Sequence, residues 1–248
     1  MIGFELDSAR MSEAPAIPAP IKMPSRPDVQ LSLPRIAGHG GRRQGAGRKP
    51  SGRRVGVPHR RRCTHKARHP VHVTLRAREG LPSFRGDKLV LEALLAAIGL
   101  AQNSSFRVVH FSVQSNHLHL LVEAHDGAAL SRGMQGLAIR MARGVNRALG
   151  SAGVVFADRY HARELTTPRE TRAALLYVLQ NWAKHGTGGR FDPFSSAAWF
   201  DGWASPPPRS TSPPRVAPPR TWLVTVGWRR HGLLRPGEKP ASLRDAPN

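Results

Sequence analysis

The sequence predicts an α+β fold: an antiparallel sheet with helices on one face and a further helix after the last strand. Three observations predict it. Short segments alternate apolar and polar residues, longer segments repeat apolar residues at helical spacing, and the two kinds follow one another as β-α-β-β-α-β-α between residues 70 and 186. This order is the split βαβ, or ferredoxin-like, arrangement.

The first strand and the first helix follow a basic segment. Val71 to Arg76 alternates, with apolar residues at the odd positions and His72, Thr74 and Arg76 at the even ones, which is typical of a half-buried strand. Lys88 to Ala101 is rich in Leu and Ala and predicts the first helix.

A β-hairpin is expected next. Phe106 to Val113 predicts the second strand and His117 to Ala124 the third, and a tight turn at Gln114 to Asn116 joins them. The Asp126-Gly127 pair ends the hairpin.

Two more helices and one strand complete the predicted domain. Apolar residues at helical spacing predict a long helix that ends at Gly150, and Val155 to Leu165 predicts the fourth strand. The last helix begins at Thr167 and Pro168, because Pro is favoured at the first helical position, and Gly186 closes it.

Charge and composition limit the class of protein. The chain has 38 Lys and Arg against 16 Asp and Glu, a net charge of +22, which favours a partner rich in phosphate. A single cysteine, Cys63, excludes a disulfide framework and a cysteine-rich zinc module. No apolar run reaches the length of a membrane span, and the start lacks a secretion signal. We therefore expect a soluble cytoplasmic protein that binds nucleic acid.

The two ends differ from the centre. We expect a disordered basic arm at residues 1–67, an ordered domain at 68–186, and a Pro- and Trp-rich tail at 187–248, whose tryptophans hold short pieces of it in place. From Arg35 to Arg78 there is no Asp or Glu, so this stretch can follow a phosphate backbone, although a solubilising role stays open. The arm residues expected to contact DNA are Arg42, Arg43, Arg48, Lys49, Arg53 and Arg54.

Two histidines of the predicted third strand are candidate metal ligands. His117 and His119 are two residues apart, so both imidazoles project from one face of the strand, while Leu118 and Leu120 face the core. Two adjacent imidazoles can hold a divalent ion. The spacing alone also allows surface histidines, and a metal site would need at least one further protein ligand.

The last helix offers that ligand and a nucleophile. Tyr177 and Asn181 are one turn apart. A narrow polar stripe on this helix contains Glu170, Tyr177, Asn181 and Lys184. A phenol beside an open metal site, ionised or nearly so, can attack a phosphodiester and become linked to DNA. The chain has two tyrosines, Tyr160 and Tyr177, and we predict that Tyr177 attacks, because only it has an amide one turn later.

Several motifs resemble one family. Ser115 to Val122 (SNHLHLLV) resembles the His-hydrophobic-His strand of single-tyrosine (Y1, HUH) transposases of the IS200/IS605 type, most closely the REP-associated tyrosine transposases. Tyr177 to Asn181 (YVLQN) is similar to the helix that carries their nucleophile. Phe156 to His161 and Gly45 to Pro50 are also similar to this group. The chain departs from the pattern at Trp182, where these relatives usually have Pro, and in its tail.

The resemblance, which spans about residues 68–186, implies a bacterial, nucleoid-associated transposase that cleaves and rejoins single-stranded DNA next to hairpins. It implies that His117, His119 and Asn181 bind Mg²⁺ or Mn²⁺, and that Tyr177 forms a 5′-phosphotyrosine while a 3′-hydroxyl is released. We also expect His72, Arg76 and Lys184 to contact DNA. A homodimer is one expected state of assembly.

Two alternatives stay open. The first is a metal-dependent nuclease that uses the histidine pair with His125 and Asp126, although no acidic cluster surrounds the pair. Such an enzyme would leave no covalent protein–DNA adduct. The second is a non-catalytic or domesticated DNA-binding protein derived from a transposase. A zinc deaminase is excluded, because the paired cysteines of that class are absent.

Overall fold

The computed structural model describes residues 64–182, 190–208 and 210–239. Contacts divide the chain into two units, Met1–Pro50 and Ser51–Asn248, and every described residue lies in the second. The DNA contacts predicted in the basic arm, Lys184 and the predicted helix end at Gly186 all lie outside the described residues.

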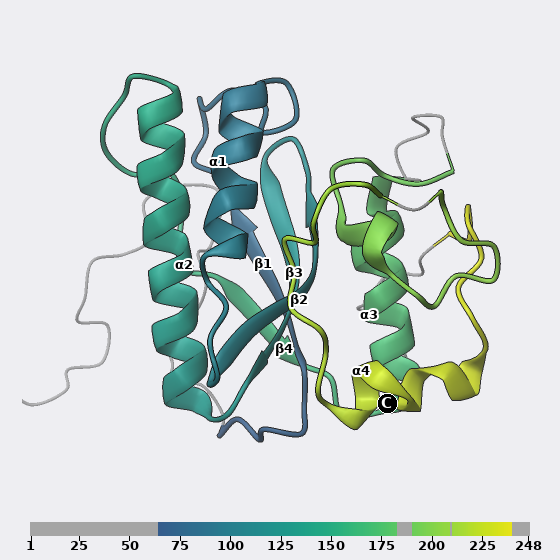
Figure 1. The fold of residues 1–248 in the computed structure, drawn as a ribbon. Helices are drawn as coiled ribbons and strands as arrows, with labels where there is room; N and C mark the ends of the chain where they lie inside the picture. The colour runs from purple at the N-terminus through teal and green to yellow at the C-terminus, as the bar shows by residue number, and fades with distance from the viewer. Residues whose placement is uncertain (1–63, 183–189, 209, 240–248) are drawn as a thin grey trace, which may run out of the picture. The chain divides into compact units, whose positions relative to one another are not determined.

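In the described residues, four strands form one antiparallel sheet in the order β2-β3-β1-β4 (Figure 1). The strands are β1 (Val71–Arg76), β2 (Phe106–Val113), β3 (His117–Ala124) and β4 (His161–Glu164). The first three have the bounds that the sequence predicted. The predicted α+β class and the split βαβ order are confirmed.

The fourth strand is shorter than predicted. Strand pairing was expected from Val155 to Leu165, but only the segment of β4 pairs with β1, and Phe156 makes an isolated bridge to Ala77. Between the two lies a local turn, in which the Asp158 carboxylate accepts a hydrogen bond from the backbone N–H of Arg159 at 2.7 Å. The turn interrupts the pairing with β1, because the Arg159 N–H bonds to the Asp158 side chain and not to a carbonyl of the neighbouring strand.

The helices begin at the capping residues that the sequence favours. They are α1 (Lys88–Gly99), α2 (Gly127–Ala148) and α3 (Pro168–Gln180). Asp87 and Asp126 cap the first two through backbone N–H groups, and Thr167 forms a reciprocal capping box with Glu170 at the start of α3. Among the described helices, none is long and apolar enough to cross a membrane.

One face of the sheet is covered by α1 and α2, which lie side by side in Figure 1. Alternate strand residues pack there against the inner sides of both helices. The largest fully buried side chains of this core include Phe84, Phe106, Phe111, Met134 and Leu137. This is the core that the sequence pattern predicts.

The other face is covered by α3 and by the C-terminal segment (Figure 1). That segment forms short helical turns: η2 (Ser196–Trp199), α4 (Trp222–Thr225) and η3 (Gly227–His231). Trp203 and Trp228 are buried in a second apolar cluster with Leu121 of β3 and Leu175 of α3. Parts of residues 190–208 and 210–239 are thus packed onto the domain, where a tail with short pieces held by its tryptophans was expected.

Polar contacts also join this segment to the domain. The buried Glu123 carboxylate of β3 accepts hydrogen bonds from the backbone N–H of Arg220 and from the N–H and hydroxyl of Thr221, the shortest at 2.7 Å. Arg172 of α3 donates to both oxygens of Glu238 at 2.7 and 3.0 Å. These contacts hold the segment at residues 220–221 and near its C-terminal end, in addition to its buried tryptophans.

Candidate active site on the polar face of the sheet

The two histidines of β3 converge as the alternation predicted. Leu118 and Leu120 are buried in the core under α1 and α2, so His117 and His119 project toward α3. Their Nε2 atoms lie 3.0 Å apart. The two rings are edge-on, with centroids 4.6 Å apart.

The other nitrogen of each ring has an oxygen partner. Nδ1 of His117 lies 2.8 Å from Oδ1 of Asn116, and Nδ1 of His119 lies 3.2 Å from Oγ1 of Thr74, its register partner on β1. When each Nδ1 carries the proton and donates it to that oxygen, both Nε2 lone pairs are turned toward one another. This is the arrangement of metal-binding histidines, whose second nitrogen is usually fixed by a hydrogen bond.

Tyr177 of α3 reaches the same place. Its ring meets the His119 ring edge-on, with centroids 4.8 Å apart. Burial raises the pKa of the Tyr177 phenol above its usual value. In the protein alone the phenol therefore carries its proton near neutral pH.

His72 lies inside the site. It is 6% exposed, stacks on His119 at 5.3 Å and meets Tyr177 edge-on at 5.7 Å. Burial, then the charges of His161 and Arg163, lower its pKa to about 4. A DNA contact was expected for His72, but its position leaves it little exposed surface for a phosphate, so we assign it to the support of His119 and Tyr177.

Asn181 follows Tyr177 by one helical turn and is 3% exposed. The preceding amide, Gln180, is turned toward the C-terminal segment: it donates to the carbonyl of Arg235 at 2.7 Å and accepts from the N–H of Gly237 at 2.6 Å. Asn181 is thus the amide on the side of Tyr177. No three His, Cys, Asp or Glu side chains within the described ranges form a group that could hold a metal ion.

In the described part of the predicted polar stripe, Glu170 and Tyr177 are partly buried and Asn181 is buried. Glu170 is occupied by the capping box and by Arg163 at 2.9 Å, and apolar residues cover most sides of the helix. Of the residues predicted to contact DNA, Arg76 is exposed and lies opposite His117 in the sheet register.

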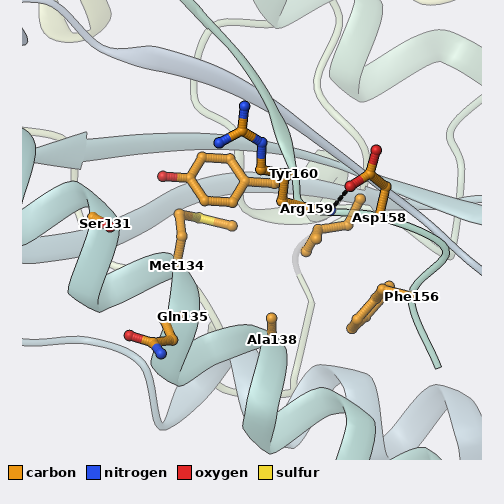
Figure 2. A pocket seen from close by; sticks show the side chains of 9 residues that line it. Ser131, Met134, Gln135, Ala138, Phe156, Asp158, Arg159 and Tyr160 are labelled. Carbon is orange, nitrogen blue, oxygen red and sulfur yellow. Dashed lines mark hydrogen bonds between the residues drawn. The ribbon is translucent and has the colours of Figure 1, made fainter. Parts of the chain in front are cut away.

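Tyr160 lies on the other side of the sheet. It packs against the core under α1 and α2 and lines an open pocket of about 370 Å³ with Met134, Gln135 and Phe156 (Figure 2). The two tyrosines of the chain are therefore separated by the sheet, and Tyr177 is the one whose ring meets His119.

The residues of the alternative nuclease site are apart. His125 and Asp126 follow the far end of β3, both are exposed, and Asp126 caps α2 through the N–H of Ala129 at 2.7 Å. They are eight and nine residues beyond His117 along the extended chain, which corresponds to more than about 20 Å. The histidine pair and this pair do not form one cluster.

Two comparisons with known proteins find similarities to this chain. Residues 66–180 match the family model described as "Transposase IS200 like". This part of the chain is an IS200-like transposase domain. A solved structure described as a REP-associated tyrosine transposase bound to a REP hairpin is similar to the chain with a TM-score of 0.45 and 17% identity, over 56% of this chain and 82% of that one. The comparison with curated proteins finds no match. The transposase match includes both histidines and Tyr177 and ends one residue before Asn181.

Sequence reasoning missed two supporting residues of the transposase domain, Thr74 and Asn116. Thr74 was placed on the polar face of β1, but only the register that sets it opposite His119 shows its role. Asn116 was assigned to a turn, and its contact with His117 depends on how that turn closes.

Proposed function

We propose that this transposase domain cleaves and rejoins single-stranded DNA with Tyr177 as the nucleophile. The observation that carries the proposal is the contact between the Tyr177 and His119 rings beside two converging Nε2 atoms. The position of Tyr160 across the sheet supports the choice between the two tyrosines.

The reaction needs no water. The phenol oxygen of Tyr177 forms a bond to phosphorus, the bond from phosphorus to the 3′-oxygen breaks, and the products are a 5′-phosphotyrosine and a 3′-hydroxyl. The phenol gives up its proton, and the leaving oxygen takes one up. Because the phosphodiester energy is kept in the new bond, attack by a 3′-hydroxyl reverses the step and joins two strands.

His117, His119 and Asn181 would hold the cation, Mg²⁺ or Mn²⁺. The residues fit it: two nitrogens 3.0 Å apart can both bind one small divalent ion at about 2.1 Å, and an amide oxygen suits a hard cation. When bound, the ion polarises a non-bridging oxygen of the scissile phosphate. His72 and Thr74 hold the His119 ring in place for it.

The substrate we propose is a single strand beside a hairpin stem. The net charge of +22 favours a phosphate-rich partner, and the arm residues named above remain predicted contacts. A reaction on chromosomal DNA places the protein at the nucleoid. A homodimer remains a prediction.

The test is incubation of the full chain with a library of single-stranded hairpins and Mn²⁺, followed by a denaturing gel. We expect a covalent adduct that His117→Ala and His119→Ala each reduce by at least about 100-fold, because polarisation and alignment of the phosphate are lost. DNA binding in EDTA should persist in both variants. Strand cleavage without an adduct would indicate the nuclease alternative, and binding without cleavage would indicate a non-catalytic protein.

A further inference from the structure

Arginines of the described domain differ in how their charge is balanced. Several lie beside a carboxylate, and their role in the fold is then clear. These pairs include Arg85–Asp192, Arg107–Glu123, Arg163–Glu170, Arg172–Glu238 and Arg229–Asp201. Helix α2 is different, because it contains no Asp or Glu from Gly127 to Ala148.

Four exposed arginines form a stripe on α2: Arg132, Arg140, Arg143 and Arg147. At 3.6 residues per turn they fall within an arc of about 80° and span about 22 Å. The arc lies on the outer side of the helix, opposite the buried Met134 and Met141. Within the part of the chain that the structure describes, no carboxylate forms an ion pair with any of the four.

A hollow of about 270 Å³ lies at the N-terminal part of this stripe, lined by Arg132, Arg140, Asn103, Ser105 and Gly136 among others. A Cβ on Gly136 would lie 3.4 Å from a terminal nitrogen of Arg140, so this guanidinium lies over bare helix backbone. The neighbouring Gly133 has a packing reason, since a Cβ there would lie 2.2 Å from the Phe106 ring. Nothing comparable packs on Gly136, and its missing side chain leaves the hollow open between two arginines.

We propose that the outer side of α2 binds the phosphate backbone of DNA, with one phosphate in the hollow between Arg132 and Arg140 and later ones at Arg143 and Arg147. The stripe is as long as about six base pairs of duplex. It is on the side of the sheet away from Tyr177, so the DNA held here is the hairpin stem that flanks the cleaved strand. The inference rests on the proposed function, because the ligand is the DNA that the domain cuts.

The first test compares two double variants, each of which removes two positive charges. Arg132→Gln with Arg140→Gln removes them from the stripe, and Lys88→Gln with Lys239→Gln removes two other exposed charges as a matched control. Binding of a hairpin is measured against salt concentration. The stripe variant should lose about 1.8 from the slope of log affinity against log salt, at about 0.9 per phosphate contact, and the control should keep the parent slope. Equal slopes in both variants would overturn the proposal.

The second test uses the hollow itself. Gly136→Gln fills it without adding charge, and Gly136→Glu fills it and places a carboxylate between the two arginines. We expect hairpin affinity to fall several-fold in the first and at least tenfold in the second. The thermal midpoint should not fall for Gly136→Gln, because Gln favours helix more than Gly does. Unchanged affinity in both variants, or a fall in affinity only together with unfolding, would contradict the proposal.

A third measurement separates this inference from the proposed function. Cleavage of a saturating, unstructured single strand should be the same in the Arg132/Arg140 variant and in the parent, since Tyr177 lies on the opposite side of the sheet. If the parent cleaves no DNA but the Arg132/Arg140 variant binds the hairpin more weakly than the parent, the proposed function is wrong and the proposed DNA-binding stripe is supported. If the Arg132/Arg140 variant cleaves normally and binds the hairpin as the parent does, only the proposed role of the stripe is wrong.

Discussion

The two faces of the sheet are built by different means. Under α1 and α2, alternate residues of β1 and β3 are apolar, as are those of β2 on either side of a bulge between Val108 and His110, and the core is continuous. The opposite face begins with polar residues, including His72, Thr74, His117 and His119, and becomes apolar only farther along, where α3 and the C-terminal segment cover it. The first face provides stability. The second holds polar groups in a buried position beside Tyr177, which favours chemistry there.

The cover of the second face has a consequence for the site. Tyr177 and Asn181 belong to a helix that is packed between the sheet and residues 190–239, so the position of both depends on that segment. Changes on this face should therefore affect both stability and chemistry, whereas changes under α1 and α2 should affect stability alone.

The largest expected effect on folding tests whether the second face is a true core. Trp228→Ala should lower the free energy of unfolding by about 3–5 kcal/mol, because its ring is fully buried between α3 and the C-terminal segment. Phe111→Ala, on the first face, is the matched comparison and should cost a similar amount. Denaturant unfolding measures both. A loss below about 1 kcal/mol for Trp228→Ala alone would mean that the segment is only loosely attached.

Lowering the pH from about 6.5 to 4 should reduce the free energy of unfolding by about 3 kcal/mol through one buried histidine. His110 of β2 is buried under η2, with Nδ1 3.1 Å from the Ser196 hydroxyl, and burial lowers its pKa to about 4. The unfolded chain, with a histidine pKa of about 6.5, binds the proton more readily. Stability is thus fully present above about pH 6.5 and falls as the pH drops toward 4.

The variant His110→Gln isolates this contribution. A comparison with the parent is needed because His72, whose pKa is also lowered to about 4, adds a similar pH dependence to both proteins. Thermal or denaturant unfolding at several pH values should show a smaller loss between pH 6.5 and 4 in the variant than in the parent. Equal losses would show that the second face admits water around His110.

A smaller effect is expected at Glu123. Glu123→Gln replaces one carboxylate oxygen by an amide that faces N–H donors of the C-terminal segment, so we expect a loss of about 1–3 kcal/mol. The exposed Glu92, 3.8 Å from Arg215, provides the control, because Glu92→Gln should cost less than about 1 kcal/mol. If the two variants unfold alike, the carboxylate does not fix the segment.

The sequence allowed the first face to be predicted better than the second. Strands β1 and β3 have the predicted bounds because alternation reports the face that packs under α1 and α2 directly, and β2 has its predicted bounds although a bulge interrupts its alternation. The packing of the C-terminal segment was not predicted, because its short helical turns and prolines give no hydrophobic periodicity. The sequence of α3 did indicate such a cover. A helix that is apolar on most sides is usually buried on most sides, and α3 has apolar residues around most of its circumference: Ala174, Leu175, Leu176, Val178 and Leu179.

Part of the site could be predicted for the same reason. The spacing of His117 and His119 requires a shared face, and the polar phenol of Tyr177 one turn before an amide marked the helix. Their meeting could not be predicted from spacing, because it depends on how α3 crosses the sheet. The burial of His72 likewise depends on α3, which sequence alternation cannot place.

The central claim is that the reactive tyrosine lies on the covered polar face. The direct measurement is to trap the covalent complex formed with a single-stranded hairpin and Mn²⁺, digest it, and identify the modified peptide by mass spectrometry. We predict that DNA is attached to Tyr177, that Tyr177→Phe forms no adduct while folding normally, and that Tyr160→Phe forms as much adduct as the parent. An adduct on Tyr160, or one that persists in Tyr177→Phe, would contradict the account.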